Sequence, residues 1–167
     1  MSIKLLILDV DGTMTNGKIT YSNSGEEFKS FCVKDGLAIA SWIRLGRSVA
    51  IITGRESKIV EKRAQELGIE FFYQKVKDKA SKAEEIFERL NIGWESVATI
   101  GDDLNDYSML RRAKQSFAPS NAVEYIKQRV TTNLKAKGGE GAVREMIELL
   151  IKQEGLYKEY LGLWDAE

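Results

Sequence analysis

Carboxylates, a hydroxyl group and a cation follow three short apolar runs of this sequence. Asp9 and Asp11 follow the first run, Thr53-Gly-Arg55 follows the second, and the acidic segment 101–106 follows the third. Each group alone fits a turn or a helix N-terminus, where these residue types are favoured. Carboxylates gathered at one place without compensation, however, repel one another and raise their own pKa values. A divalent cation removes that conflict, so the pattern indicates a metal site.

The oxygen donors of this set suit magnesium. Mg²⁺ prefers octahedral oxygen coordination and commonly binds one or two carboxylates together with a substrate phosphate. Asp9 and Asp102 could hold the ion. Asp9 could also offer an oxygen to phosphorus as a nucleophile, while Thr53 donates a hydrogen bond to a phosphoryl oxygen. A balancing lysine is predicted at Lys79, because Asp78 as an N-cap would place it in the first turn of a helix, where phosphate is favoured.

The composition restricts which side chains could transfer protons. The 167 residues include no histidine and one cysteine, and 25 Lys and Arg balance 25 Asp and Glu. A histidine general base, a histidine-bound metal and an internal disulfide are therefore excluded. Proton transfer falls to Asp, Glu, Lys or Tyr. The zero net charge and the lack of a basic stripe argue against nucleic acid as a partner.

The opening segment 1–9 contains an apolar run, but the run is too short to cross a membrane. Asp9 stands where a signal peptide would carry small residues. We therefore expect no membrane partner and a cytoplasmic location, and a single cysteine agrees with a reducing compartment.

The apolar runs that precede the polar groups are predicted to be strands of one parallel sheet. Three runs lack polar alternation and indicate strands buried on both faces: Ile3–Leu8, Val49–Ile52 and Val97–Ile100. Weaker strand candidates are Phe71–Tyr73, Gln115–Phe117 and Val130–Thr132. Amphipathic stretches predict helices over Leu37–Leu45, Ser57–Leu67, Ala80–Leu90, Leu104–Arg112, Asn121–Gln128 and Ala142–Gln153. The alternation predicts an α/β fold with a Rossmann-like parallel sheet and helices on both faces, whose ligands bind at the carboxyl ends of the strands.

The length fits a single domain over residues 1–167. Segment 17–31 interrupts the alternation with a turn-rich stretch between two short extended ones, which predicts a β-hairpin inserted after the first strand. Segment 155–167 is too apolar for a disordered tail and is expected to dock on the protein or on a neighbour. The intervals between the polar groups are already filled by these elements, so no cap domain is expected.

In this order, the polar groups resemble the haloacid dehalogenase (HAD) superfamily of aspartate-nucleophile phosphatases. The matching segments are Asp9-Val-Asp-Gly-Thr13, Ile51-Ile-Thr-Gly-Arg55, Lys79 and Gly101-Asp-Asp-Leu-Asn-Asp106. Within that superfamily the chain is similar to the small 3-deoxy-D-manno-octulosonate 8-phosphate phosphatases through segments 31–36, 67–74 and 138–145. The resemblance implies a place in lipopolysaccharide synthesis. Phosphatases of nonulosonate (sialic-acid-type) phosphates share the pattern and stay as the alternative.

The resemblance implies a role for each matching residue. Asp9 would attack phosphorus and become an aspartyl phosphate. Asp11 would protonate the leaving alkoxide and then activate the hydrolytic water. Magnesium would bind Asp9, Asp102 and the backbone carbonyl of Asp11. Thr53 and Lys79 would hold phosphoryl oxygens and offset the charge that develops during transfer.

The same resemblance implies which residues contact the sugar acid. They would be Asp11, Cys32, Val33, Lys34, Asp35, Gly36, Arg55, Arg63 and Lys79. Arg55 and Arg63 suit a carboxylate-bearing substrate, because a guanidinium group pairs with a carboxylate through two hydrogen bonds. Asp103 and Asp106 would orient the site from behind it.

Two residues depart from the family pattern, and both concern the sugar rather than the phosphatase chemistry. Cys32 stands where relatives often have Asn, and Ala38 stands where a second glycine is common. Without a cap domain, an open site needs closure from elsewhere. The resemblance implies a homotetramer in which hairpins assemble and neighbours shape each entrance. The tail 156–164 would join that closure or pack on its own subunit, and the loop 138–141 would line a neighbouring site or start a helix.

Two other classes of protein compete with this interpretation. A phospho-receiver domain also uses Asp, Thr, Lys and magnesium on a parallel sheet, but its lysine comes last, whereas Lys79 precedes the final acidic cluster here. A non-catalytic binding homologue is disfavoured because the nucleophile, acid–base, hydroxyl, lysine and metal positions are all intact.

Overall fold

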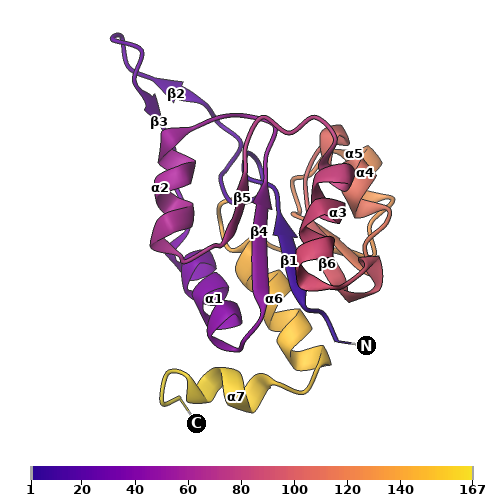
Figure 1. The fold of residues 1–167 in the computed structure, drawn as a ribbon. Helices are drawn as coiled ribbons and strands as arrows, with labels where there is room; N and C mark the ends of the chain where they lie inside the picture. The colour runs from indigo at the N-terminus through magenta and orange to yellow at the C-terminus, as the bar shows by residue number, and fades with distance from the viewer. Residues whose placement is uncertain (1, 167) are drawn as a thin grey trace.

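A computed structural model describes residues 2–166 and shows a six-stranded sheet at the centre of the molecule (Figure 1). In spatial order the strands are β5 (Phe71–Tyr73), β4 (Ser48–Ile52), β1 (Leu5–Leu8), β6 (Val97–Ile100), β7 (Gln115–Ala118) and β8 (Thr132–Asn133). Every neighbouring pair is parallel. Leu8 lies opposite Ile51 on one side and Ile100 on the other, so the three central strands end at nearly the same level.

The central strand is buried on both faces, which is why its sequence shows no polar alternation. All four residues of β1 have no exposed surface. Successive side chains point to opposite faces. Leu6 and Leu8 belong to one core cluster, and Leu5 and Ile7 belong to the other.

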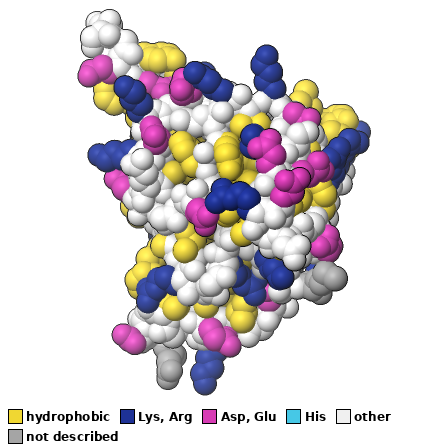
Figure 2. Space-filling model, viewed as in Figure 1, with side chains coloured by type: hydrophobic (Ala, Val, Ile, Leu, Met, Phe, Trp, Pro, Cys, Tyr) yellow, Lys and Arg dark blue, Asp and Glu magenta, His cyan; other side chains and the backbone are white. Residues whose placement is uncertain are grey.

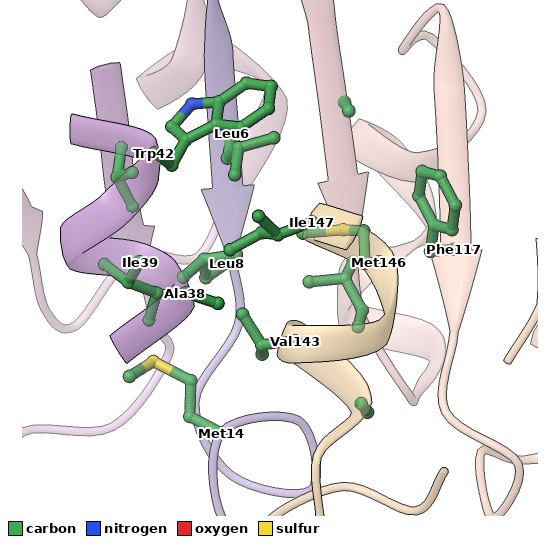
Figure 3. Packing of buried hydrophobic residues seen from close by; sticks show 14 of the residues in the cluster. Leu6, Leu8, Met14, Ala38, Ile39, Trp42, Phe117, Val143, Met146 and Ile147 are labelled. Atoms are coloured by element: carbon green, nitrogen blue, oxygen red, sulfur yellow. The ribbon is translucent and has the colours of Figure 1, made fainter. Parts of the chain in front are cut away.

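Helices cover both faces of the sheet. The first face carries α1 (Val33–Arg44), α2 (Lys58–Glu66) and α6 (Ala142–Gln153), and the second carries α3 (Lys79–Leu90) and α4 (Tyr107–Leu110). Figure 3 shows Trp42 and Ile39 of α1 and Met146 of α6 gathered around Leu6 and Leu8 of β1. The α/β sheet with helices on both faces is therefore confirmed.

Some predicted boundaries shift for identifiable reasons. Helix α1 begins at Val33 rather than Leu37, and Cys32 is its N-cap. In its first turn Val33 and Lys34 are exposed and the buried residues are Asp35 and Gly36, so the turn lacks an apolar period. The predicted helix over 104–112 divides into a 3₁₀ turn η2 (Leu104–Asp106) and α4. The other short elements are η1 (Trp94–Ser96), α5 (Glu124–Lys127) and α7 (Tyr157–Gly162).

The inserted segment after β1 is a short antiparallel hairpin that projects from the body of the molecule (Figure 1). Its strands are β2 (Thr20–Tyr21) and β3 (Glu27–Phe28). Gly25 has a positive φ of 85°, which the turn between the strands requires. Ile19, Tyr21 and Phe28 are largely exposed on it.

The described part of the chain has no cap domain between its motifs. Between β1 and β4 lie the hairpin and α1, and between β4 and β6 lie α2, β5, α3 and η1. Within residues 2–166 no helix is long and apolar enough to cross a bilayer.

The C-terminal tail packs on its own subunit. Tyr160 is buried, the Trp164 indole N–H donates to Ser41 Oγ at 3.0 Å, and the Arg44 guanidinium lies 4.9 Å from the Trp164 ring centre. Figure 1 places α7 at the end of the molecule opposite the hairpin. The described tail therefore does not cover the carboxyl edge of its own sheet, and own-subunit packing is the arrangement that the structure shows.

Candidate active site

The ends of β1 and β4 meet in a small cavity of about 80 Å³. Its walls are Asp9, Asp11, Thr53, Gly54, Arg55 and Asn105. Asp9 directly follows β1, and Thr53 directly follows β4, so the level strand ends explain why these side chains meet. Both residues are buried: 4% of the surface of Asp9 and 3% of the surface of Thr53 are exposed.

Lys79 contacts the site through Asp9 and does not itself line the cavity. It is the first residue of α3, whose N-cap Asp78 accepts a hydrogen bond from the Ser81 backbone N–H. Its ammonium donates to Asp9 Oδ1 and to Asp106 Oδ1, both at 2.6 Å. Burial alone would lower the pKa of Lys79, but the two carboxylates raise it above its usual value. Lys79 therefore remains a cation behind the predicted nucleophile.

Asp106 orients the acidic loop. Its Oδ1 receives Lys79, and its Oδ2 accepts hydrogen bonds from the backbone N–H groups of Asp102 at 2.9 Å and Asp103 at 3.2 Å. A side chain at Gly101 would overlap this carboxyl group, so the glycine allows the approach. Asp103 is exposed, and its Oδ1 accepts from the Leu104 N–H at 2.7 Å, which organises the turn.

The remaining carboxylates fit a magnesium ion. Oxygen atoms of Asp9, Asp102 and Asp106 lie within 4.8 Å of one another. Because Asp106 already accepts from three donors, Asp9 and Asp102 are the carboxylates left for a metal. Burial and then Asp106 raise the pKa of Asp102 to about 7, and the same two causes raise the pKa of Asp9 against the effect of Lys79. One ammonium does not balance two buried carboxylates and the half-buried carboxylate of Asp102, and a hard divalent cation would.

Asp11 lies at the mouth of the cavity and is held by two cations. Its Oδ1 accepts a hydrogen bond from the Lys29 ammonium, and its Oδ2 lies 3.9 Å from Arg55 Nε. Sequence reasoning missed Lys29, since nothing in its spacing predicts that the hairpin folds back onto Asp11. It also missed Asn105, although that residue stands inside the acidic run.

The other predicted sugar-binding residues do not line this cavity. Val33, Gly36 and Arg63 line a separate, shallow hollow of about 270 Å³ between α1 and α2. Lys34 is exposed, and Cys32 is half-buried at the N-cap of α1. Within one subunit, the predicted substrate set is therefore divided between two places.

Asp35 serves a structural contact in this arrangement. Only 2% of the residue is exposed, and its Oδ1 accepts a hydrogen bond at 2.8 Å from the Arg144 N–H in the first turn of α6. Its Oδ2 is buried and has no hydrogen-bond partner among the described residues. Burial raises the pKa of Asp35 to about 6, because the Arg144 hydrogen bond and the charges of Arg144 and Arg63 offset only part of the desolvation.

We expect Asp35→Asn to flatten the dependence of stability on pH. A carboxyl group whose pKa is raised in the folded chain favours folding below its unfolded pKa of 3.8, and this contribution is lost as pH rises through about 6. The span corresponds to about 3 kcal/mol of unfolding free energy. Urea unfolding at about pH 4 and about pH 8 would measure it. An equal pH dependence in both proteins would show that Asp35 carries none of it.

The glycine-rich loop before α6 supports the loop that follows Asp9 in the same chain. A side chain at Gly138 would overlap the carbonyl oxygen of Gly12, and the Gly139 N–H donates to the Thr13 carbonyl at 3.0 Å. Within one subunit, the loop therefore packs against residues 12–16 of its own chain, whereas the sequence left open a role at a neighbouring site.

Known proteins are similar to this chain in sequence and in fold. A family model described as haloacid dehalogenase-like hydrolase matches residues 71–147. The 3-deoxy-D-manno-octulosonate 8-phosphate phosphatase KdsC of Escherichia coli strain K12 is 40% identical over 161 residues, which cover 96% of this chain and 86% of that protein. The chain belongs to the KdsC family of phosphatases.

Two solved KdsC-family structures superpose closely on the chain. The 3-deoxy-D-manno-octulosonate 8-phosphate phosphatase of Yersinia pestis is 42% identical, with a TM-score of 0.90 over 93% of this chain and 84% of that one. The enzyme of Moraxella catarrhalis, in complex with a magnesium ion, a phosphate ion and a KDO molecule, is 36% identical, with a TM-score of 0.93 over 97% and 93% of the two chains.

Family membership decides between the classes that the sequence left open. The chain is a HAD phosphatase, a hydrolase of phosphomonoesters, with the capless fold of its family. Its cluster of Asp9, Asp102 and Asp106 could hold a metal ion, and the Moraxella catarrhalis relative contains magnesium. The phospho-receiver and non-catalytic alternatives are thereby set aside.

Proposed function

We propose that this chain hydrolyses 3-deoxy-D-manno-octulosonate 8-phosphate to the free sugar acid and phosphate, as a step toward lipopolysaccharide. The observation that carries the proposal is the buried Asp9–Lys79–Asp106 arrangement at the strand ends of a chain that is 40% identical to KdsC along almost its whole length. The magnesium, phosphate and KDO in the Moraxella catarrhalis relative support the same substrate class.

Asp9 is the nucleophile in this proposal. Its Oδ1 is held by Lys79, which leaves Oδ2 to form the bond to phosphorus while the bond from phosphorus to the sugar oxygen breaks. Thr53 and the Gly54 backbone line the cavity that receives the phosphoryl group. Lys79 offsets the charge on Asp9 and on the phosphoryl oxygens.

Asp11 moves the protons. It lines the same cavity as Asp9, and it would pass a proton to the departing sugar oxygen. In the second half of the reaction it would take a proton from the water that attacks phosphorus, which releases phosphate and restores the Asp9 carboxylate. Asp9, Asp102 and the Asp11 backbone carbonyl would hold Mg²⁺, which when bound neutralises charge on the phosphoryl oxygens.

The cavity has room for the phosphoryl group but not for an octulosonate. Its volume is about 80 Å³, whereas pockets that enclose drug-sized ligands measure about 300–1,000 Å³. The sugar must therefore lie outside, where Arg55 stands at the mouth and is available for its carboxylate. Of the other proposed sugar contacts, Val33, Gly36 and Arg63 line the α1–α2 hollow. Cys32, Lys34 and Asp35 belong to the same segment, at the start of α1.

This division supports a homotetramer in which the hollow of one subunit, itself a single domain, faces the entrance of the next. Figure 2 shows hydrophobic and charged side chains together on the projecting hairpin. The exposed apolar side chains Tyr21, Phe28 and Val33, the last 77% exposed, suit burial between copies. Light scattering at micromolar concentration should report four chains per particle, and a monomer that retains full activity would refute shared closure.

A substrate panel tests the proposed activity. With Mg²⁺ present, kcat/KM should be at least about tenfold higher for the octulosonate 8-phosphate than for a nonulosonate phosphate or a simple hexose phosphate. Excess chelator should abolish turnover, and added Mg²⁺ should restore it. A higher kcat/KM for the nonulosonate phosphate would replace the proposed substrate with that alternative.

A cytoplasmic location is part of the proposal. The free thiol of Cys32 supports it, because unpaired cysteines are usual in reducing compartments. Fractionation of the source cells that recovered the protein outside the cytoplasm would contradict it.

A further inference from the structure

Lys29 is a buried cation at the base of the hairpin. It follows β3 directly, and its side chain has no exposed surface. Its ammonium donates to Asp11 Oδ1 and lies 3.7 Å from Glu27 Oε1. An ion pair made by an exposed lysine would contribute little to stability. A lysine side chain without access to water depends on the carboxylates that face it.

Lys29 belongs to a closed ring of four alternating charges. Glu27 Oε1 also accepts a hydrogen bond from Arg55 Nη2 at 3.1 Å, and Arg55 Nε lies 3.9 Å from Asp11 Oδ2. Burial raises the pKa of Glu27, but Lys29 and Arg55 lower it by more, so Glu27 is an anion. The ring connects the hairpin to two residues of the cavity wall, Asp11 and Arg55.

The two oxygens of Asp11 are held unequally. Oδ1 receives the hydrogen bond from Lys29, whereas Oδ2 has a longer ionic contact with Arg55. A carboxyl group with one oxygen fixed in this way presents the other oxygen in a defined direction, and orientation of this kind is a large part of catalytic rate.

We propose that Lys29 is a positioning residue, which fixes Asp11 so that Oδ2 delivers a proton to the departing sugar oxygen. This inference rests on the proposed function, because it assigns Asp11 as the acid. As the bond from phosphorus to oxygen breaks, the proton passes from Asp11 Oδ2 to that oxygen and leaves Asp11 as the anion that Lys29 and Arg55 stabilise. The water that later attacks phosphorus returns a proton to Asp11, and Lys29 takes no part in the transfer. A lysine that merely anchors the hairpin would not act on this step.

The test compares leaving groups in Lys29→Met. An alkyl phosphate loses a basic alkoxide that needs a proton, whereas p-nitrophenyl phosphate loses a stable anion that does not. The ratio kcat/KM covers the steps up to departure of the leaving group. For the alkyl phosphate that the wild type hydrolyses best, Lys29→Met should lower kcat/KM by about 10- to 100-fold. For p-nitrophenyl phosphate the loss should stay below about threefold.

Two further variants complete the comparison. Lys18→Met removes an exposed lysine from the same hairpin and should leave kcat/KM unchanged for both the alkyl phosphate and p-nitrophenyl phosphate. Lys29→Arg keeps the charge and should recover most of the alkyl phosphate activity. Equal losses on both substrates, or no loss, in Lys29→Met would overturn the positioning role.

The p-nitrophenyl phosphate activity and the far-UV circular dichroism spectrum of each variant show whether that variant is folded. If Lys29→Met does not fold, Glu27→Gln tests the same ring, with an expected selective loss of about threefold on the alkyl phosphate. A nonselective loss there would also overturn the role. The comparison needs one alkyl and one aryl phosphate, so it still decides the role of Lys29 if the octulosonate phosphate proves to be a poor substrate.

Discussion

Replacement of Asp9 by asparagine is expected to lower kcat by at least about 10⁴-fold, because an amide oxygen does not form the covalent bond to phosphorus on which the two-step reaction depends. Asp9 is 4% exposed and is fixed by Lys79 at 2.6 Å, so no neighbouring group can take over its position without rearrangement. Steady-state turnover and acid-quenched phosphoprotein would both be measured, and both should disappear.

The same variant should unfold at no lower a temperature than the wild type when chelator is present. Burial and Asp106 raise the pKa of Asp9, so the ionised side chain opposes folding near neutral pH, and the amide removes that charge. Glu88→Gln, which changes an exposed carboxylate of α3 away from the site, is the control and should keep turnover within about threefold. Substantial turnover in Asp9→Asn would mean that another group is the nucleophile.

Replacement of Lys79 by methionine has the largest expected effect on stability. The residue is fully buried, and its removal leaves Asp9 and Asp106 facing each other without a cation. Loss of one partner of a buried ion pair costs about 3–5 kcal/mol of unfolding free energy. The pKa of Lys79 is raised above its usual 10.5, so the wild-type stabilisation is complete below pH 10.5 and is lost only as pH rises beyond it.

Urea unfolding at neutral pH, with chelator and with Mg²⁺, would measure this loss. Magnesium should return part of the lost stability, because a divalent cation supplies positive charge to the same carboxylates, but it should not return activity. Lys77→Met, at an exposed position of the preceding loop, is the matched control and should behave like the wild type. Wild-type stability in Lys79→Met would show that the carboxylates do not depend on this cation.

The sequence predicts the fold well where burial leaves a simple pattern. Val97–Ile100 and Phe71–Tyr73 have the observed bounds because buried strands of a parallel sheet are continuous apolar runs, and Ala142–Gln153 has them because one helical face is apolar. The first turn of α1 was not predicted, because Val33 is 77% exposed and faces no core in the subunit.

The meeting of the proposed catalytic residues at the strand ends was predictable for a topological reason. Parallel strands bring the residues after their carboxyl ends to one edge of the sheet, so Asp9, Thr53 and Asp102 had to meet. Lys29 and Asp35 were a different problem. Their contacts depend on how the hairpin folds back and on how α1 meets α6, and Asp35 and Arg144 are separated by 109 positions in the chain. No local period encodes such distant contacts.

Asp9 and Asp11, the proposed nucleophile and the proposed acid, lie on different kinds of structure, and this has a consequence for thermal inactivation and for amide hydrogen exchange. Asp9 extends from β1, the central strand, whose amides should exchange with solvent only on global unfolding. Asp11 is held by a hairpin with two residues in each strand, which should open and exchange far more often. The hairpin should therefore open at a lower temperature than the sheet unfolds. On warming, the enzyme should lose proton transfer by Asp11 while Asp9 is still held in place.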